Sequence, residues 1–134
     1  MSAWGISNFE NDTALNWIEN LIEYSDIEAI DSIINNFVLN FDPEETSLIE
    51  CSTFLTVAEL IAGLLGHPSE DFPDELKDWI DNNYIETKKD VVDKAKKGVA
   101  LILKDSEAKE MYWDSGYQKS WVKAQKNLIK RLSE

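Results

Sequence analysis

Apolar residues recur at three- and four-residue spacing along nearly the whole chain. The first such series follows Asn11 and Asp12, either of which can cap a helix, and consists of Ala14, Leu15, Ile18, Leu21 and Ile22. This series predicts a helix that runs to about Tyr24. Residues 25–28, Ser-Asp-Ile-Glu, have the form of a capping box, and the apolar stripe behind them predicts a second helix that ends near Asn40. Because the join is short, we expect these two helices to form an antiparallel hairpin.

The segment from about 47 to 65 is apolar on nearly every side. A second capping box, Ser47 with Glu50, opens it, and Gly66 and Pro68 end it. A helix that is apolar all round is normally surrounded by other elements. We therefore expect this helix to be the central axis of the fold.

Helical spacing continues to the end of the chain. Pro73 suits the start of a short helix. A lysine-rich amphipathic helix is predicted from about 86 to 103, with Asp90–Lys94 and Asp93–Lys97 spaced for ion pairs. Gly98 inside it is tolerable if a neighbouring backbone comes close.

The final third closes with one more helical stretch. Ser106 can start it, Gly116 breaks or kinks it, and apolar positions continue to Leu132. No two-residue alternation occurs, so the class is all-α, a compact bundle of five to seven helices around the central helix. A length of 134 residues with 43% hydrophobic content suits a single domain, residues 1–134.

Charge is distributed unevenly along the chain. The net charge is −13; residues 1–87 hold 19 acidic residues and one base, Lys77, whereas residues 88–134 hold 12 basic and 7 acidic residues. One interpretation is a solubilising acidic surface on which a basic final third docks, and the other is an acidic face for a basic partner. Nucleic acid is disfavoured as a partner, because most of the surface would repel it.

The lysines from Lys88 to Lys104 allow two interpretations. They are either a patch for nucleic acid or membrane, or the solvated face of a helix that complements the acidic remainder of the protein. We favour the second, because no aromatic platform for RNA accompanies them.

Cys51 is the single cysteine, lies in the apolar segment, and is expected to be a core residue. No targeting segment and no run long enough to span a membrane appear. We expect a cytoplasmic protein that does not interact with membranes.

The opening stretch carries a family resemblance. Trp4-Gly5, Phe9-Glu10-Asn11-Asp12 and Trp17 resemble the start of a family of small bacterial proteins of unknown function, marked by Trp-Gly and Phe-x-Asn-Asp. Agreement continues at Ala58-Glu59, at Gly66-His67-Pro68 and from Pro73 to Trp79, and more weakly from Ser106 to Trp121. The resemblance implies no reaction, cofactor or catalytic residue.

The distinctive residues of this stretch have structural explanations. Packing accounts for Trp4, Phe9 and Trp17, and helix capping accounts for Asn11 and for Asp12, which could otherwise be read as a catalytic acid. Glu59 is a carboxylate inside the apolar segment, where burial is costly without partners. It is either partly exposed at a helix edge, or it accepts hydrogen bonds from backbone amides of the N-terminal segment or from the Trp4 indole.

The sequence contains no group of residues with the composition and spacing typical of a catalytic or metal-binding site. His67 is the only histidine and lacks the further ligands that zinc requires. Asp42, Glu44 and Glu45 lack the spacing of a calcium loop. Neither Cys51 nor His67 has an activating context, and carboxylate pairs are too common in an acidic protein to be informative. We expect no metal, cofactor or catalytic residue.

Two hypotheses about function remain. The first is a non-enzymatic acidic binding protein, an immunity protein that neutralises a basic bacterial toxin of the nuclease type by covering its active or substrate-binding surface. Its expected contacts are Asp42, Glu44, Glu45, Glu70, Asp71, Asp74, Asp78 and Asp81. The alternative is a housekeeping protein or small enzyme with a pocket near Trp4, Trp17 and Glu59.

Overall fold

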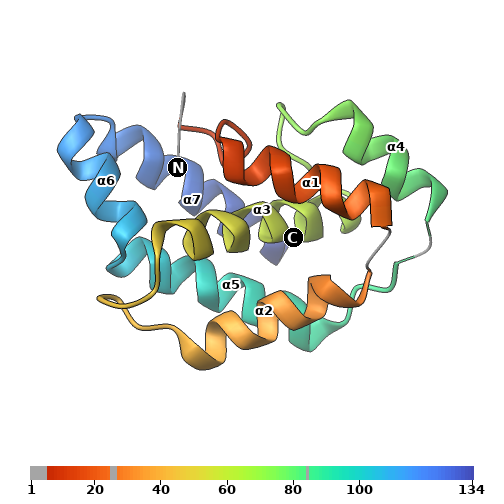
Figure 1. The fold of residues 1–134 in the computed structure, drawn as a ribbon, viewed down its shortest axis with the longest axis horizontal. Coiled ribbons are helices and arrows are strands. Elements are labelled where there is room, and N and C mark those ends of the chain that lie inside the picture. Colours follow the sequence, from red (N-terminus) through yellow and green to blue (C-terminus); the bar gives the residue numbers. More distant parts are fainter. Residues whose placement is uncertain (1–5, 25–26, 84) are drawn as a thin grey trace.

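The fold consists of helices joined by short connectors (Figure 1). A computed structural model describes residues 6–24, 27–83 and 85–134, and within these ranges it contains seven helices and no strand. The helices are α1 (Asp12–Tyr24), α2 (Glu28–Asn40), α3 (Leu48–Leu64), α4 (Asp74–Asn82), α5 (Lys89–Lys104), α6 (Glu107–Ser115) and α7 (Gln118–Ser133). The predicted all-α class is confirmed.

Helix α3 is the axis of the molecule, as predicted. It lies between α1 on one side and α2 and α5 on the other, and it also contacts α6 and α7 (Figure 1). Ser47 caps its start, since the hydroxyl accepts from the Glu50 amide at 3.1 Å. At its end Gly66 adopts a φ of 90°, and the His67 amide donates to the Ala62 carbonyl at 2.9 Å. This left-handed Schellman turn explains why a glycine is required there.

The prediction of a hairpin between the first two helices is wrong. Helix α2 packs on α5 and α3, whereas α1 packs on α3 and α4, so the two helices cover different sides of α3. The apolar stripes of α1 and α2 both pack against the axial helix, because that helix is apolar all round and can contact two neighbours on different sides. In the predicted capping box of Ser25 with Glu28, Ser25 lies outside the described residues, whereas Glu28 is the first residue of α2.

Helix α5 begins three residues later than predicted, and its lysines find other partners. Lys96 pairs with Asp93 at 3.4 Å, and Lys94 donates to the side chain of Asn35 on α2 at 3.0 Å. These contacts take the place of the two expected ion pairs, Asp90–Lys94 and Asp93–Lys97. One lysine of α5 therefore pairs within its own helix at three-residue spacing, and another forms a hydrogen bond to α2.

Gly98 of α5 accommodates an aromatic ring instead of a backbone. A Cβ atom built at this position would lie 2.1 Å from Cζ of Phe54, a fully buried side chain of α3. Phe54 in turn stacks on Phe37 of α2, with 4.2 Å between ring centroids. The missing side chain of Gly98 thus lets α5 approach the core.

The remaining boundaries follow local chemistry. Pro73 occupies the N-cap of α4, and the Ser106 hydroxyl caps α6 by accepting from the Lys109 amide at 3.0 Å. Gly116 has a φ of 84° and separates α6 from α7, so the last helical stretch is two helices. Among the described helices, none is both long enough and apolar enough to pass through a lipid bilayer.

Candidate functional site

Glu59 lies inside the protein, on the axial helix. Only 4% of the residue is exposed, so the interpretation as a partly exposed helix-edge residue is wrong. Its carboxylate accepts from Nδ2 of Asn8 at 2.9 Å and from the guanidinium of Arg131 at 2.8 and 3.3 Å. A buried carboxylate needs such partners, because burial removes the water that would otherwise solvate it.

Asn8 and Gln125 complete the polar cluster around Glu59. Asn8 Nδ2 also donates to Oε1 of Gln125 at 3.1 Å, and Gln125 Nε2 donates to Oδ1 of Asn8 at 2.8 Å. Both amides are buried, and Gln125 is fully so. We call Asn8, Glu59, Gln125 and Arg131 the Glu59 cluster; it joins the opening segment, the axial helix and the last helix.

Arg131 extends the Glu59 cluster to the end of the axial helix. Its guanidinium donates to the carbonyl of His67 at 3.3 Å and to Oδ1 of Asn127 at 2.7 Å. The Nε2 atom of His67 lies 3.9 Å from a carboxylate oxygen of Glu134. Within the described part of the chain, the buried Nδ1 atom of His67 has no hydrogen-bond partner. The bonds from Arg131 to Glu59 and to the His67 carbonyl join the last helix to the axial helix and to the turn that follows it.

The opening segment is also held outside the Glu59 cluster. Phe9 meets the edge of Phe72 with 5.6 Å between ring centroids, and the Ser7 hydroxyl donates to the carboxylate of Asp71. Asn11 caps α1 by accepting from the Ala14 amide at 2.8 Å, whereas exposed Asp12 is the first helical residue, where its charge suits the helix dipole. Trp4 lies outside the described residues.

The arrangement does not combine Trp17 and Glu59 in one pocket. Trp17 packs on the core and lines a cavity of about 190 Å³ together with Asn20, Leu21, Tyr24 and Ala29. Glu59 is absent from that lining, and both of its oxygens are engaged. The tryptophan and carboxylate pocket required by the small-enzyme hypothesis is therefore not formed by these two residues.

The structure gives Cys51 no reactive environment and forms no metal site among the residues it describes. Cys51 is fully buried, and burial raises the pKa of its thiol to about 11, so it stays protonated and unreactive near neutral pH. In the described ranges, no group of three or more histidine, cysteine, aspartate or glutamate side chains is placed to hold a metal ion.

The eight acidic residues expected to contact a partner fall into two groups. Asp42, Glu44 and Glu45 belong to the connector before α3, whereas the other five lie in the loop after α3 and on α4. The 17 residues of α3 separate the groups by about 25 Å, and Figure 1 shows them at opposite ends of the molecule. One small contact area cannot include both.

The group at α4 is largely free of internal partners. Asp71 is occupied, because its two oxygens accept from the hydroxyls of Ser7 and Ser69. The others are exposed and form no ion pair with any described residue; these are Glu70, Asp74, Asp78 and Asp81. We call these four residues the α4 acidic surface.

The connector group has a partly structural role. Oδ1 of Asp42 accepts from the amides of Glu44 and Glu45 at 2.9 and 3.3 Å, and the Asp42 amide donates to the buried Thr46 hydroxyl at 2.8 Å. These bonds form a compact turn that leaves the side chains of Glu44 and Glu45 exposed. The turn therefore presents two carboxylates at a fixed position.

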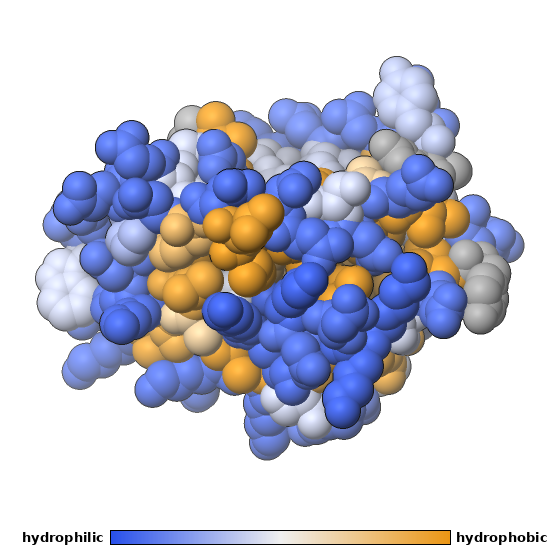
Figure 2. Space-filling view, turned by 90° about the horizontal axis from the view of Figure 1, so that it is seen from below, coloured by the Kyte–Doolittle hydropathy of each residue, from blue (hydrophilic) through white to orange (hydrophobic). Residues whose placement is uncertain are grey.

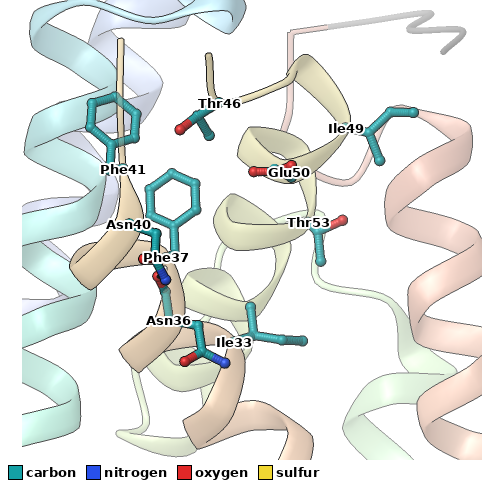
Figure 3. A pocket seen from close by; sticks show the side chains of 9 residues that line it. All are labelled: Ile33, Asn36, Phe37, Asn40, Phe41, Thr46, Ile49, Glu50 and Thr53. Carbon is teal, nitrogen blue, oxygen red and sulfur yellow. The ribbon is translucent and has the colours of Figure 1, made fainter. Parts of the chain in front are cut away.

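A groove between α2 and α3 is a feature that the sequence did not reveal. It has a volume of about 330 Å³ and is lined by Ile33, Asn36, Phe37, Asn40, Phe41, Thr46, Ile49, Glu50 and Thr53. Figure 3 shows Phe37 and Ile33 on α2 and Ile49 and Thr53 on α3, the two helices that border the groove. No sequence signal marks such a groove, because it depends on the angle between two helices.

The basic residues gather on the last third of the fold. Exposed lysines at positions 119, 123, 126 and 130 follow the three- and four-residue spacing of one face of α7. At the start of α5, Lys88 forms an ion pair with Asp31 of α2 at 3.8 Å. This pair agrees with the interpretation that the basic third complements the acidic remainder.

Three members of the Glu59 cluster were missed from the sequence. Gln125 gives a usable signal, because it interrupts the apolar stripe of Trp121, Leu128 and Leu132 on the last helix. Asn8 and Arg131 give none, since each resembles an ordinary polar residue near a helix end.

The family model for DUF4259, described as a domain of unknown function, matches residues 2–124. No curated protein and no solved structure matches the chain. The expected membership of a family of unknown function is thus confirmed at that level, while the Trp-Gly and Phe-x-Asn-Asp signature stays a prediction.

Proposed function

Because the chain belongs to the DUF4259 family, for which no activity is assigned, we propose its function from the surface: it is a non-enzymatic acidic protein that neutralises a basic bacterial toxin. In this proposal it acts in the cytoplasm as an immunity protein and covers the active or substrate-binding surface of a nuclease-type toxin. The observation that carries the proposal is the α4 acidic surface, whose four carboxylates form no ion pair with any residue that the structure describes.

The electrostatics support a basic protein as the partner. Asp74, Asp78 and Asp81 follow helical spacing, so they line one side of α4. A nuclease must attract phosphates, and its cationic surface is therefore complementary to an array of fixed carboxylates. Long-range attraction between such surfaces accelerates encounter, which suits a protein that must capture a toxin quickly.

The first test is the gene neighbourhood. A gene directly upstream that encodes a toxin with a basic C-terminal domain supports the proposal, whereas a metabolic cluster supports a housekeeping enzyme. In the laboratory, the protein is immobilised and exposed to the upstream gene product at low and moderate salt. Failure to retain it even at low ionic strength contradicts the proposal.

Charge reversal tests the surface itself. Asp74→Lys with Asp78→Lys is expected to slow association with the retained protein about tenfold or more at low salt, because steering depends on local charge. Asp105→Lys with Asp114→Lys is the matched control, since both residues are exposed and the change in net charge is the same. Equal slowing by the two pairs would assign the effect to net charge and contradict a specific α4 surface.

A further inference from the structure

The groove between α2 and α3 has an apolar floor that is part of the core. Phe37 forms this floor; its ring lies 4.2 Å from the Phe54 ring and 5.3 Å from the Phe41 ring, measured between centroids. Ile33 and Ile49 extend the apolar lining on either side. A floor fixed by core packing does not need to rearrange when a partner binds, which lowers the entropic cost of binding.

A large apolar side chain stands exposed in the lining of the groove. It is Ile49 on the α3 side, which is 56% exposed. Viewed from the side of α2 and α5, hydrophobic atoms gather in patches among hydrophilic ones, and one patch lies toward the end where the α2–α3 connector is found (Figure 2). Covering such side chains is favourable by about 25 cal/mol for each Å² of apolar surface removed from water.

The rim of the groove is acidic. Glu50 lines it, as does Thr46, which directly follows the exposed residues Glu44 and Glu45 in the chain. On the α2 side Asn36 and Asn40 supply amide groups. Asn40 donates to the Asn36 carbonyl at 3.0 Å, which leaves its side-chain oxygen as an acceptor. An apolar floor with an anionic and accepting rim fits a ligand that is apolar at its centre and cationic around it.

These features select among the possible occupants. A second copy would bring Asp42, Glu44, Glu45 and Glu50 of both molecules together at a two-fold contact, where the charges repel. Nucleic acid is repelled by the same carboxylates. A basic amphipathic helix matches both floor and rim, because its apolar stripe can enter the groove while its lysines or arginines reach the acids.

We propose that this groove binds a basic amphipathic helix of the partner protein, with an apolar side chain of that helix packed against Phe37 and Ile49. The inference rests on the proposed function in one respect, namely that the partner is basic. It adds a second contact, about one length of α3 away from the α4 acidic surface.

The test uses a labelled synthetic peptide of 16 residues, with leucines at helical spacing on one face and lysines elsewhere, and follows fluorescence anisotropy at low salt. Wild-type protein is expected to bind it at least tenfold more tightly than a peptide of the same composition whose leucines are scrambled. Equal affinity for the two peptides would show binding by charge alone and overturn the proposal.

Ile49→Asp separates the apolar contact from charge. The substitution makes the protein more acidic, so binding by charge alone would tighten, whereas insertion into the groove predicts at least tenfold weaker binding. Tyr24→Asp is the matched control, since Tyr24 is another exposed apolar residue, at the far end of α1, and its variant should bind as tightly as wild type. Unchanged or tighter binding by Ile49→Asp overturns the proposal.

A measurement on the wild-type protein avoids any dependence on variant folding. In methyl NMR spectra, titration with the leucine–lysine peptide is expected to shift the Ile33 and Ile49 signals first. Shifts confined to isoleucines outside the groove, such as Ile80 on α4, would overturn the groove as the site. That outcome would leave the charge-reversal test at Asp74 and Asp78 unaffected, so the two proposals fail separately.

Discussion

The carboxylate of Glu59 and the guanidinium of Arg131, 72 positions apart in the chain, form a two-bond ion pair at 2.8 and 3.3 Å. Both side chains are largely buried, with 5% and 13% of their surfaces exposed. The pair fixes the last helix to the axial helix, and Asn8 adds the opening segment to the same carboxylate. The opening stretch, the most distinctive part of the sequence, therefore has a structural role through Asn8.

Removing the charge of Glu59 should destabilise the fold. Glu59→Gln leaves the buried guanidinium of Arg131 without a counter-charge, a change that typically costs about 3–5 kcal/mol. Urea unfolding should show this loss, and a Glu59→Leu, Arg131→Leu double variant should be less destabilised than the sum of its single variants. Lys96→Met breaks an exposed ion pair and serves as the control, with a loss below about 1 kcal/mol. Unchanged melting of Glu59→Gln would contradict the structural role of the pair.

Asn8 should stabilise the fold through its hydrogen bonds to two buried side chains, Glu59 and Gln125. Asn8→Ala removes hydrogen bonds from both Glu59 and Gln125, and leaving buried polar groups unsatisfied costs about 1–3 kcal/mol each. The loss should appear in the free energy of unfolding, with protection of the opening amides from hydrogen exchange reduced in parallel. Asn16→Ala, at an exposed position of α1, should change stability by less than about 0.5 kcal/mol. Similar losses in the two variants would count against the Glu59 cluster.

Gly98 should resist replacement, although alanine is the better helix former. Alanine at an ordinary helical position gains about 1 kcal/mol over glycine, but here its Cβ would overlap the ring of Phe54. We expect Gly98→Ala to destabilise the protein by about 1–3 kcal/mol in thermal or urea unfolding. Combining it with Phe54→Leu should give less than the sum of the two losses. A stabilised Gly98→Ala protein would show that the ring moves away without cost.

The periodic pattern of apolar residues was sufficient to predict where the helices lie in the sequence, but not how they pack against one another. The limits of α1 and the ends of α2 and α3 were predicted because caps and apolar stripes are local signals. The hairpin was mispredicted because a short connector restricts only distance, while the all-round apolar α3 could accept α1 and α2 on different sides. Gly98 shows the same limit, since its neighbour, Phe54, is distant in sequence.

The sequence identified Glu59 as an unusual residue of the interior but did not identify the side chains that bind it. Glu59 stood out as a carboxylate in an apolar helix, and the N-terminal segment was one of the expected donors. Among the described residues of that segment, the donor is the Asn8 side chain, and Arg131, which forms two bonds, lies on the last helix. Such pairings follow from tertiary packing, which no spacing rule encodes. The groove depends on packing in the same way.

Cys51 should make the protein sensitive to alkali. Burial raises the pKa of its thiol to about 11 from 9.0, and the charges of Glu107 and Glu50 act in the same direction. Between those values the thiol ionises in the unfolded chain before it does so in the folded protein, so the unfolded chain binds fewer protons and stability falls as pH rises. The loss approaches about 1.4 kcal/mol per pH unit in this range.

The comparison with Cys51→Ala isolates this effect from other alkaline titrations. The slope of unfolding free energy against pH between 9 and 11 should be smaller for the variant, whatever its stability at pH 7. At neutral pH the wild-type thiol should react with a thiol reagent only as fast as the protein opens. Rapid reaction in the folded state, or identical slopes, would contradict the enclosed position of Cys51.

The most direct test of the account uses a basic nuclease-type toxin domain, where the gene neighbourhood supplies one. The rate of nucleic-acid hydrolysis by that domain is measured with and without an equimolar amount of the protein. The proposed neutralisation predicts that hydrolysis is abolished at a 1:1 ratio, and that the variant carrying Asp74→Lys and Asp78→Lys inhibits more slowly. Full hydrolysis in the presence of saturating wild-type protein would contradict the proposed function.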